Sequence, residues 1–326
     1  MIELDIRDLL LSVTNFCLGS CVYCNLKSLK AFSLEKEIEI KDIERLLADS
    51  LLDGLKNIHI TGGEPILTPK TYEVFRLIKE YHPNIRINMP VSGFFPYTTE
   101  RYLKKLWTLT PQLRVDVSLD GPKNIHEKTR GKGSFKQVMK TIELLNETAP
   151  KDKLQLQLTL MESNYRYIRW VYDLANSMGR GFYVTFPHFG TRFGHEEDRH
   201  HIHKQKFIDT VEQQLQSSWL LERPLNRRIW TEQKSIWEDK ETRFDCDMGK
   251  HSIDVDSFGN VYPCMVYLKN QIFGNIRNES LSSMFKKQSA NTIFENIANR
   301  TCQPCVMPCC AWKRNLTING KAIGLD

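Results

Sequence analysis

The stretch LLLSVTNFCLGSCVYC, residues 9–24, joins an apolar run to three closely spaced cysteines. The run Leu9–Thr14 is short, apolar and bounded by a polar residue, which predicts a buried β-strand. The cysteines that follow, Cys17, Cys21 and Cys24, have the spacing C-x3-C-x2-C, with no fourth candidate ligand nearby. A structural zinc site would be closed by a fourth ligand. Thiolates are the usual ligands of iron–sulfur clusters, and three of them would leave one iron of a four-iron cluster open. We therefore interpret this loop as a candidate catalytic cluster site.

The composition indicates a globular protein that binds metal. Hydrophobic residues make up 41% of the 326 residues, which is ordinary for a globular chain. The nine cysteines are odd in number and grouped, which favours metal binding in a reducing cytoplasm over disulfides. No run of eighteen apolar residues and no signal peptide are evident, so we expect no membrane span. The net charge of +6 is modest and spread out, which predicts no nucleic-acid partner.

Short apolar strands alternate with amphipathic helices from residue 7 to about 190. The strands are predicted at Leu9–Thr14, Asn57–Thr61, Ile85–Val91, Leu113–Leu119, Leu154–Met161 and Phe182–Pro187. One helix is expected around residues 43–51, ending near Gly54, and another is expected to begin with a capping box at Ser134–Gln137. Six successive βα units predict an α/β fold with a parallel sheet, open or curled into a partial barrel. In such barrels the functional site lies at the carboxyl ends of the strands.

One predicted strand has an alternating pattern. In residues 154–160 leucines alternate with Gln155, Gln157 and Thr159, whereas strands of parallel sheets are usually apolar on both faces. The polar residues indicate either a strand that borders a polar lumen or an edge strand with one solvated face. The sequence leaves both interpretations open.

The second strand ends in TGGEP, residues 61–65. Two glycines at a strand end allow the backbone to approach a ligand closely, although a tight turn would explain them equally well in isolation. The cysteine loop, with Tyr23 before Cys24, and this TGGEP stretch occur in the order seen in one known family. Together they resemble the signature motifs of the radical S-adenosylmethionine (radical SAM) superfamily.

That resemblance implies roles for both motifs. Cys17, Cys21 and Cys24 would hold a [4Fe-4S] cluster whose open iron binds S-adenosylmethionine. The methionyl amino group of this cofactor would be held by the residues of the second motif, and Tyr23 would shield the cluster edge. The residues implied for the amino group are Gly62, Gly63, Glu64 and Pro65.

The fourth strand reads VSLDGP, residues 117–122, and is followed by His126, Arg130 and Gly131. This segment resembles radical SAM enzymes that carry a C-terminal SPASM or twitch extension, and it implies that Ser118 and Arg130 contact the cofactor. The alternative is that Asp120 begins a simple turn and Arg130 is a surface charge. The third strand ends in VSG where the family often has TNG, so no asparagine role is carried over.

The last quarter of the chain contains a second candidate metal site. Cys246 and Cys264 flank a predicted hairpin, and Cys302 and Cys305 form a C-x2-C pair. Four thiolates are enough to close a cluster, while a zinc ribbon with four cysteines is the alternative. The resemblance is to the twitch form of the SPASM domain, which implies one auxiliary [4Fe-4S] cluster.

Two further cysteines, Cys309 and Cys310, remain. They could replace a cluster ligand, be inert buried thiols, or act as catalytic hydrogen-atom donors to the substrate. Met265 stands where relatives that mature sulfatases typically have an aspartate base, which argues against that activity. The expected organisation is a radical SAM partial barrel, (β/α)6 and TIM-like, at 1–195, a helical bridge at 196–242 and a SPASM/twitch auxiliary-cluster domain at 243–326.

The resemblance implies an enzyme that cleaves S-adenosylmethionine reductively and uses the 5′-deoxyadenosyl radical to abstract hydrogen from a substrate. The expected substrate is a ribosomally synthesised peptide, modified by crosslinking, epimerisation or oxidation. A sugar or aminocyclitol metabolite is the alternative, and a non-catalytic zinc-binding module is a further one. An external electron donor of the flavodoxin or ferredoxin type is the expected partner.

Overall fold

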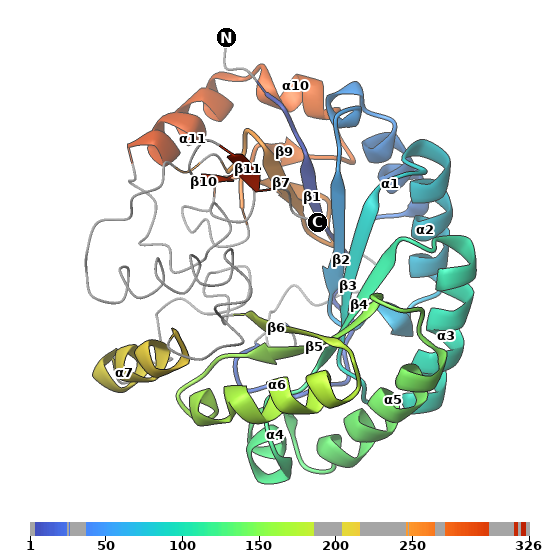
Figure 1. Cartoon of the computed structure of the whole chain (residues 1–326). Helices are drawn as coiled ribbons and strands as arrows, with labels where there is room; N and C mark the ends of the chain where they lie inside the picture. The colour runs from blue at the N-terminus through green and yellow to red at the C-terminus, as the bar shows by residue number, and fades with distance from the viewer. Residues whose placement is uncertain are drawn as a thin grey trace.

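A curved sheet of nine strands organises the part of the chain that this computed structural model describes (Figure 1). The described residues are 4–24, 26, 37–185, 204–215, 246, 248–264, 271–299, 316–318 and 321–323. The strand order is β6-β5-β4-β3-β2-β1-β7-β8-β9. Six consecutive parallel strands form the first part of the sheet: β1 Asp8–Thr14, β2 Asn57–Gly62, β3 Arg86–Val91, β4 Leu113–Ser118, β5 Leu154–Thr159 and β6 Gly181–Thr185.

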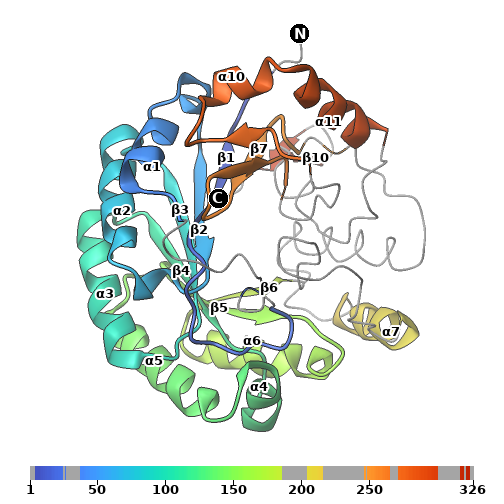
Figure 2. The same ribbon diagram turned by 180° about the vertical axis from the view of Figure 1, so that it is seen from behind.

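Helices that connect these strands cover the convex outer face of the sheet (Figures 1 and 2). They are α1 Ile40–Leu47, α2 Lys70–Tyr81, α3 Pro96–Leu109, α4 Lys123–Arg130, α5 Ser134–Thr148 and α6 Ile168–Ser177. The fold is therefore the predicted α/β partial barrel. In the described residues no helix combines the length and the hydropathy that a membrane crossing requires.

The polar residues of the alternating pattern in β5 share one face of the sheet with polar residues of β4. Because β5 pairs with both β4 and β6, the edge-strand interpretation is wrong. The register places Gln155 beside Asp116 and Gln157 beside Ser118, so polar residues of two neighbouring strands share one face. The Gln155 amide donates a hydrogen bond to Asp116, which is 4% exposed. The interior of the barrel therefore holds buried polar groups.

Two helix predictions need correction. The first helix stops at Leu47 rather than near Gly54, and a separate 3-10 turn, η3 Ser50–Leu52, follows with Asp49 as its N-cap. The predicted capping box at Ser134–Gln137 is wrong, because α5 already begins at Ser134. Gly133, at φ +83°, is its N-cap. The Ser134 hydroxyl instead donates to the Gly131 carbonyl at 2.6 Å.

The C-terminal region extends the barrel sheet. The hairpin of β7 Ser252–Val255 and β8 Asn260–Tyr262 is followed by β9 Gly274–Asn275, and β7 pairs in parallel with β1. Two helices follow, α10 Leu281–Phe285 and α11 Gln288–Ala298, and a separate two-stranded sheet has strands β10 Leu316–Ile318 and β11 Lys321–Ile323.

Aromatic packing builds the core of this region. Phe273 lies 4.6 Å from Phe285 and 5.3 Å from Phe294 between ring centroids. These residues belong to the same continuous hydrophobic core as the barrel strands. Of the predicted bridge at 196–242 only α7 Lys204–Leu215 is described, so the domain boundaries stay predictions.

Candidate metal and cofactor site

The three N-terminal cysteines lie on the loop that follows the carboxyl end of β1. Cys17 and Cys21 are half-buried and Cys24 is exposed. Burial raises the pKa of the Cys17 thiol to about 11, although a hydrogen bond from Gly19 N at 3.3 Å opposes this rise. A metal that binds here must therefore displace a proton from Cys17.

The thiols are not arranged around a single point. Within the described residues, no three His, Cys, Asp or Glu side chains gather where one metal ion could bind. A cubane cluster presents separate iron atoms to separate cysteines, so its ligands do not have to converge.

The glycines that end β2 bring its backbone against the cysteine loop. Gly63 N donates to Thr14 O at 2.7 Å, and Glu64 N donates to Phe16 O at 2.8 Å. A Cβ atom on Gly62, whose φ is +131°, would lie 2.1 Å from Thr14 O, and one on Gly63 would lie 2.2 Å from Phe16 O. The close approach predicted from the sequence is thus made to the cysteine loop itself.

Glu64 has a buried carboxylate, and one of its oxygens lacks a donor among the described residues. The residue is 2% exposed, and Oε2 accepts a hydrogen bond from Ser92 N at 2.9 Å. Oε1 has no hydrogen-bond partner in the described residues. Burial raises the pKa of this carboxyl, and the hydrogen bonds from Ser92, the charge of Arg130 and the nearby backbone N–H of Ile66 oppose the rise. An unpaired buried acceptor is costly, so this oxygen suits a cationic donor supplied by a ligand.

Pro65 has a structural position rather than a polar one. It is buried at the first position of the 3-10 turn η4 Pro65–Leu67. Its carbonyl accepts a hydrogen bond from Thr71 Oγ1 at 2.6 Å.

Arg130 is a buried cation, so the surface-charge interpretation is wrong. Its side chain is 6% exposed, and Nε donates to Asp120 Oδ2 at 2.6 Å. Asp120 is fully buried, and its other oxygen accepts from Thr159 N at 2.9 Å. The guanidinium also lies 5.5 Å from the Tyr23 ring centroid, and Nη1 lies 3.9 Å from Cys21 Sγ. This network connects the ends of β4 and β5 with the cysteine loop.

Tyr23 and Ser118 lie at the same end of the barrel. Tyr23 is half-buried, and its hydroxyl is 3.4 Å from Thr159 Oγ1. Ser118 is 6% exposed on the polar face, in register with Gln157. The structure therefore brings together the candidate residues from β1, β2, β4 and the end of α4.

Sequence reasoning missed a second ion pair close to the loop, between the buried Glu37 and the partly buried Lys70. Glu37 accepts hydrogen bonds from Thr14 Oγ1 at 2.9 Å and Asn15 N at 2.6 Å. Lys70 Nζ lies 3.0 Å from Glu37 Oε2 and donates to Val13 O at 3.2 Å. No local sequence signal identifies Glu37, because its partners come from two other segments.

His126 has a supporting position beside Asp120. Its ring is fully buried, and Nδ1 accepts a hydrogen bond from Asp120 N at 3.2 Å. Burial lowers the pKa of His126 to about 3, so the ring is neutral at physiological pH. It helps to fix the turn that presents Asp120 to Arg130.

The second group of cysteines is only partly described. Cys246 precedes β7 and Cys264 follows β8. Both are half-buried and pack against the hydrophobic core. The candidate ligands Cys302 and Cys305 and the candidate hydrogen-atom donors Cys309 and Cys310 lie outside the described residues. The auxiliary ligand set therefore stays a prediction.

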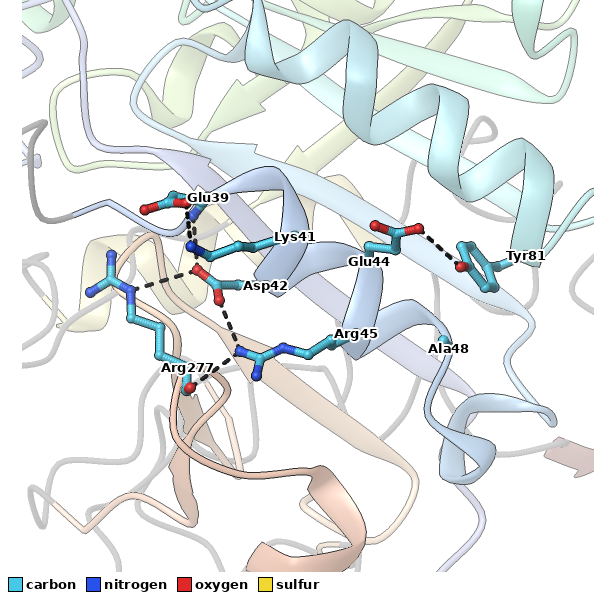
Figure 3. Close-up of a pocket in the computed structure, with 8 residues that line it drawn as sticks. All are labelled: Glu39, Lys41, Asp42, Glu44, Arg45, Ala48, Tyr81 and Arg277. Carbon is cyan, nitrogen blue, oxygen red and sulfur yellow. Dashed lines mark hydrogen bonds and ion pairs between the residues drawn. The ribbon is translucent and has the colours of Figure 1, made fainter.

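A groove on the outer surface is separate from this site (Figure 3). It has a volume of about 660 Å³ and is lined by Glu39, Lys41, Asp42, Glu44, Arg45, Ala48, Tyr81 and Arg277. Arg45 Nη2 donates to Asp42 Oδ1 and to Ile276 O, both at 2.9 Å. These contacts attach α1 to the loop that precedes α10.

The comparisons with known proteins agree with this arrangement. The sequence model of the radical SAM superfamily matches residues 11–174, and that of SPASM, an iron–sulfur cluster-binding domain, matches residues 246–310. The antilisterial bacteriocin subtilosin biosynthesis protein AlbA of Bacillus subtilis is 24% identical over 314 residues, which cover 91% of this chain and 63% of AlbA. The chain thus spans less than two thirds of the length of that relative.

Two further relatives extend the comparison. The cysteine-type anaerobic sulfatase-maturating enzyme of Clostridium novyi is 23% identical over 306 residues, covering 87% of this chain and 80% of the enzyme. The structure of Streptococcus suis SuiB matches with a TM-score of 0.67 and 15% identity, covering 94% of this chain and 72% of SuiB. At this identity the structural likeness supports the fold.

Proposed function

The chain belongs to the radical SAM superfamily and carries a SPASM-type cluster-binding domain, and on this basis we propose that it modifies a ribosomally synthesised peptide. Its cofactors are [4Fe-4S] clusters and S-adenosylmethionine. When bound, they supply a 5′-deoxyadenosyl radical that abstracts hydrogen from the substrate. An external one-electron donor supplies the electron for each cleavage.

The observation that carries this proposal is the Oε1 atom of Glu64, which has no hydrogen-bond partner in the described part of the chain. It belongs to a residue that is 2% exposed and whose backbone N–H is bonded to Phe16 O, next to Cys17. An ammonium group donates up to three hydrogen bonds and carries the opposite charge. The methionyl amino group of S-adenosylmethionine therefore fits this oxygen, whereas a closed zinc site would leave the oxygen without a donor.

The other assigned residues have supporting tasks. Cys17, Cys21 and Cys24 would hold the cluster, and Gly62 and Gly63 would keep the TGGEP backbone beside it. Ser118 and Arg130 would contact the polar groups of the cofactor. The ring of Tyr23 would exclude water from the cluster edge.

Two relatives favour a peptide substrate. AlbA takes part in the biosynthesis of a bacteriocin, and SuiB has been solved bound to the precursor peptide SuiA. The sulfatase-maturating relative also has a protein as its substrate. We assign Cys246, Cys264, Cys302 and Cys305 to the auxiliary cluster, and Cys309 and Cys310 to hydrogen-atom donation.

Anaerobic reconstitution tests the proposal. The protein should take up about eight irons, as two cubane clusters require, and form 5′-deoxyadenosine when reduced with dithionite in the presence of S-adenosylmethionine. Incubation with the precursor peptides encoded near its gene should then change the peptide. A loss of two mass units indicates oxidation or crosslinking, and deuterium uptake from heavy water without other change indicates epimerisation.

The matched control is the variant with Cys17, Cys21 and Cys24 all replaced by alanine, which should retain only the auxiliary iron and form no 5′-deoxyadenosine. Tightly bound zinc without cofactor cleavage would refute the enzyme. Cofactor cleavage with turnover of a sugar or aminocyclitol, and of no peptide, would refute the substrate class.

A further inference from the structure

Two neighbouring side chains hold the guanidinium of Arg130. Its Nε atom is bound to Asp120, and Nη2 donates to Thr159 Oγ1 at 3.4 Å. A guanidinium is not deprotonated in proteins. The side chain therefore stays charged. Because a guanidinium is planar, two fixed nitrogens determine where the third one lies.

That third nitrogen faces a cysteine that is a candidate cluster ligand. Nη1 lies 3.9 Å from Cys21 Sγ. The backbone enforces this proximity, because Val22 N donates to Thr129 O at 2.9 Å and thereby ties the residue after Cys21 to the residue before Arg130. A side chain on Gly131 would lie 2.8 Å from Ser20 Oγ, so the two segments are also closely packed.

A cation at a cluster thiolate has an electrochemical consequence. The reduced form of a cluster carries one more negative charge than the oxidised form. A nearby cation and N–H donor therefore stabilise the reduced form more strongly and raise the reduction potential. Side chains that hold such a donor in place therefore also influence the reduction potential, because they fix the position of the donor.

We propose that Arg130 raises the reduction potential of the radical-generating cluster through the sulfur of Cys21, and that Asp120 and Thr159 are positioning residues that hold it there. This role is additional to any contact with the cofactor, and it applies before the cofactor binds. It rests on the proposed function only in requiring a cluster on Cys17, Cys21 and Cys24.

The test is a redox titration of the reconstituted full chain without S-adenosylmethionine, followed by electron paramagnetic resonance. The signal of this cluster is the one absent from the variant that lacks the three cysteines. The cluster takes up one electron from dithionite, and ferricyanide removes it again. Arg130→Gln should shift the midpoint potential to a more negative value, and Arg130→Lys should shift it less in the same direction.

A double variant separates tuning from a purely structural role. Arg130→Gln with Asp120→Asn removes the buried pair without leaving an unpaired charge, so it preserves the fold better. It should still have a more negative potential than the wild type, because the donor nearest to the sulfur is gone. The matched control is Arg169→Gln with Asp173→Asn on α6, an exposed pair with an Nε–Oδ1 distance of 2.7 Å, which should leave the potential unchanged.

The outcomes are distinct. A wild-type potential in all three Arg130 variants would overturn the proposal, even if their affinity for S-adenosylmethionine fell, since Arg130 would then act only on the cofactor. Failure of all three variants to assemble the cluster would also overturn it, because Arg130 would then be needed for assembly rather than tuning. Failure of the wild type to form 5′-deoxyadenosine would count against the proposed function, but the measured potentials would still decide this inference.

Discussion

Replacing Gly63 by alanine is the sharpest test of how the cysteine loop is held. A Cβ atom at this position would lie 2.2 Å from Phe16 O, 2.6 Å from Phe16 C and 2.7 Å from Asn15 O. All three are backbone atoms, so no side-chain rotation can relieve the clash. The end of β2 must therefore move away from the loop.

The magnitude follows from what that movement breaks. Overpacking at a rigid position costs about 1–3 kcal/mol. The hydrogen bonds from Gly63 N to Thr14 O and from Glu64 N to Phe16 O are worth about 1 kcal/mol each. We therefore expect the free energy of unfolding to fall by about 3–5 kcal/mol. The iron content after reconstitution should fall as well, because the displaced strand end supports the loop.

Denaturant titration of the apoprotein under reducing conditions measures the first effect, and iron analysis measures the second. Gly54→Ala is the matched control, since its Cβ would lie 3.5 Å from Asp5 Oδ1, an ordinary contact. It should change the stability by less than about 1 kcal/mol. If Gly63→Ala behaved like Gly54→Ala in both assays, the close backbone approach would not hold the loop.

Three further predictions concern buried carboxyl groups. Glu64→Gln should leave the iron content unchanged but weaken the binding of S-adenosylmethionine by roughly tenfold or more, because a charged hydrogen bond contributes ~1.5–3 kcal/mol. If equilibrium binding gave equal affinities for the variant and the wild type, Glu64 would not be part of the cofactor site. Lys70→Met should destabilise the chain by about 3–5 kcal/mol because Glu37 is left buried without its cation, and adding Glu37→Gln should recover most of that loss in denaturant titration. Equal losses in the single and double variants would contradict the ion-pair argument. Burial raises the pKa of Asp116 to about 6. Between about pH 4 and pH 6 the folded chain therefore keeps a proton that the unfolded chain has lost. The free energy of unfolding should fall by about 3 kcal/mol as the pH rises through that window. The stability of Asp116→Asn relative to the wild type should therefore increase by about that amount from pH 4 to pH 7, and a difference that did not depend on pH would refute this assignment.

The strands could be predicted from the sequence because each is a short apolar run between polar or turn residues. The predicted and observed starts agree within one residue for all six strands. Some predicted ends were one or two residues too long, as at Leu119 and Met161, because these residues are also buried although the strand pairing has ended. Apolar patterning reports burial, and burial continues beyond the hydrogen-bonded ladder.

The candidate site could be predicted only where its residues are local in sequence. The spacing of the cysteines and the TGGEP stretch are readable from the chain itself. The environment of Arg130 is not, because Thr159 comes from the next strand and Tyr23 from a loop more than one hundred residues earlier. Which charged groups become buried together depends on how the strands meet at one end of the barrel.

The pairing of β1 with both β2 and β7 has a consequence for how charge can move in this protein. The cysteine loop begins beyond Thr14, while β7 is in register with Asp8 to Leu11 of β1. Through β7, Tyr262 of β8 is at the level of Leu10, and Cys264 follows it by two residues. At about 3.3 Å per residue, Thr14 lies about 13 Å beyond the level of Leu10. The cysteine loop and the hairpin between Cys246 and Cys264 are therefore attached to one continuous hydrogen-bonded sheet. If Cys246 and Cys264 hold an auxiliary cluster, as proposed above, this sheet connects it to the radical-generating cluster, and an electron would pass between the two clusters.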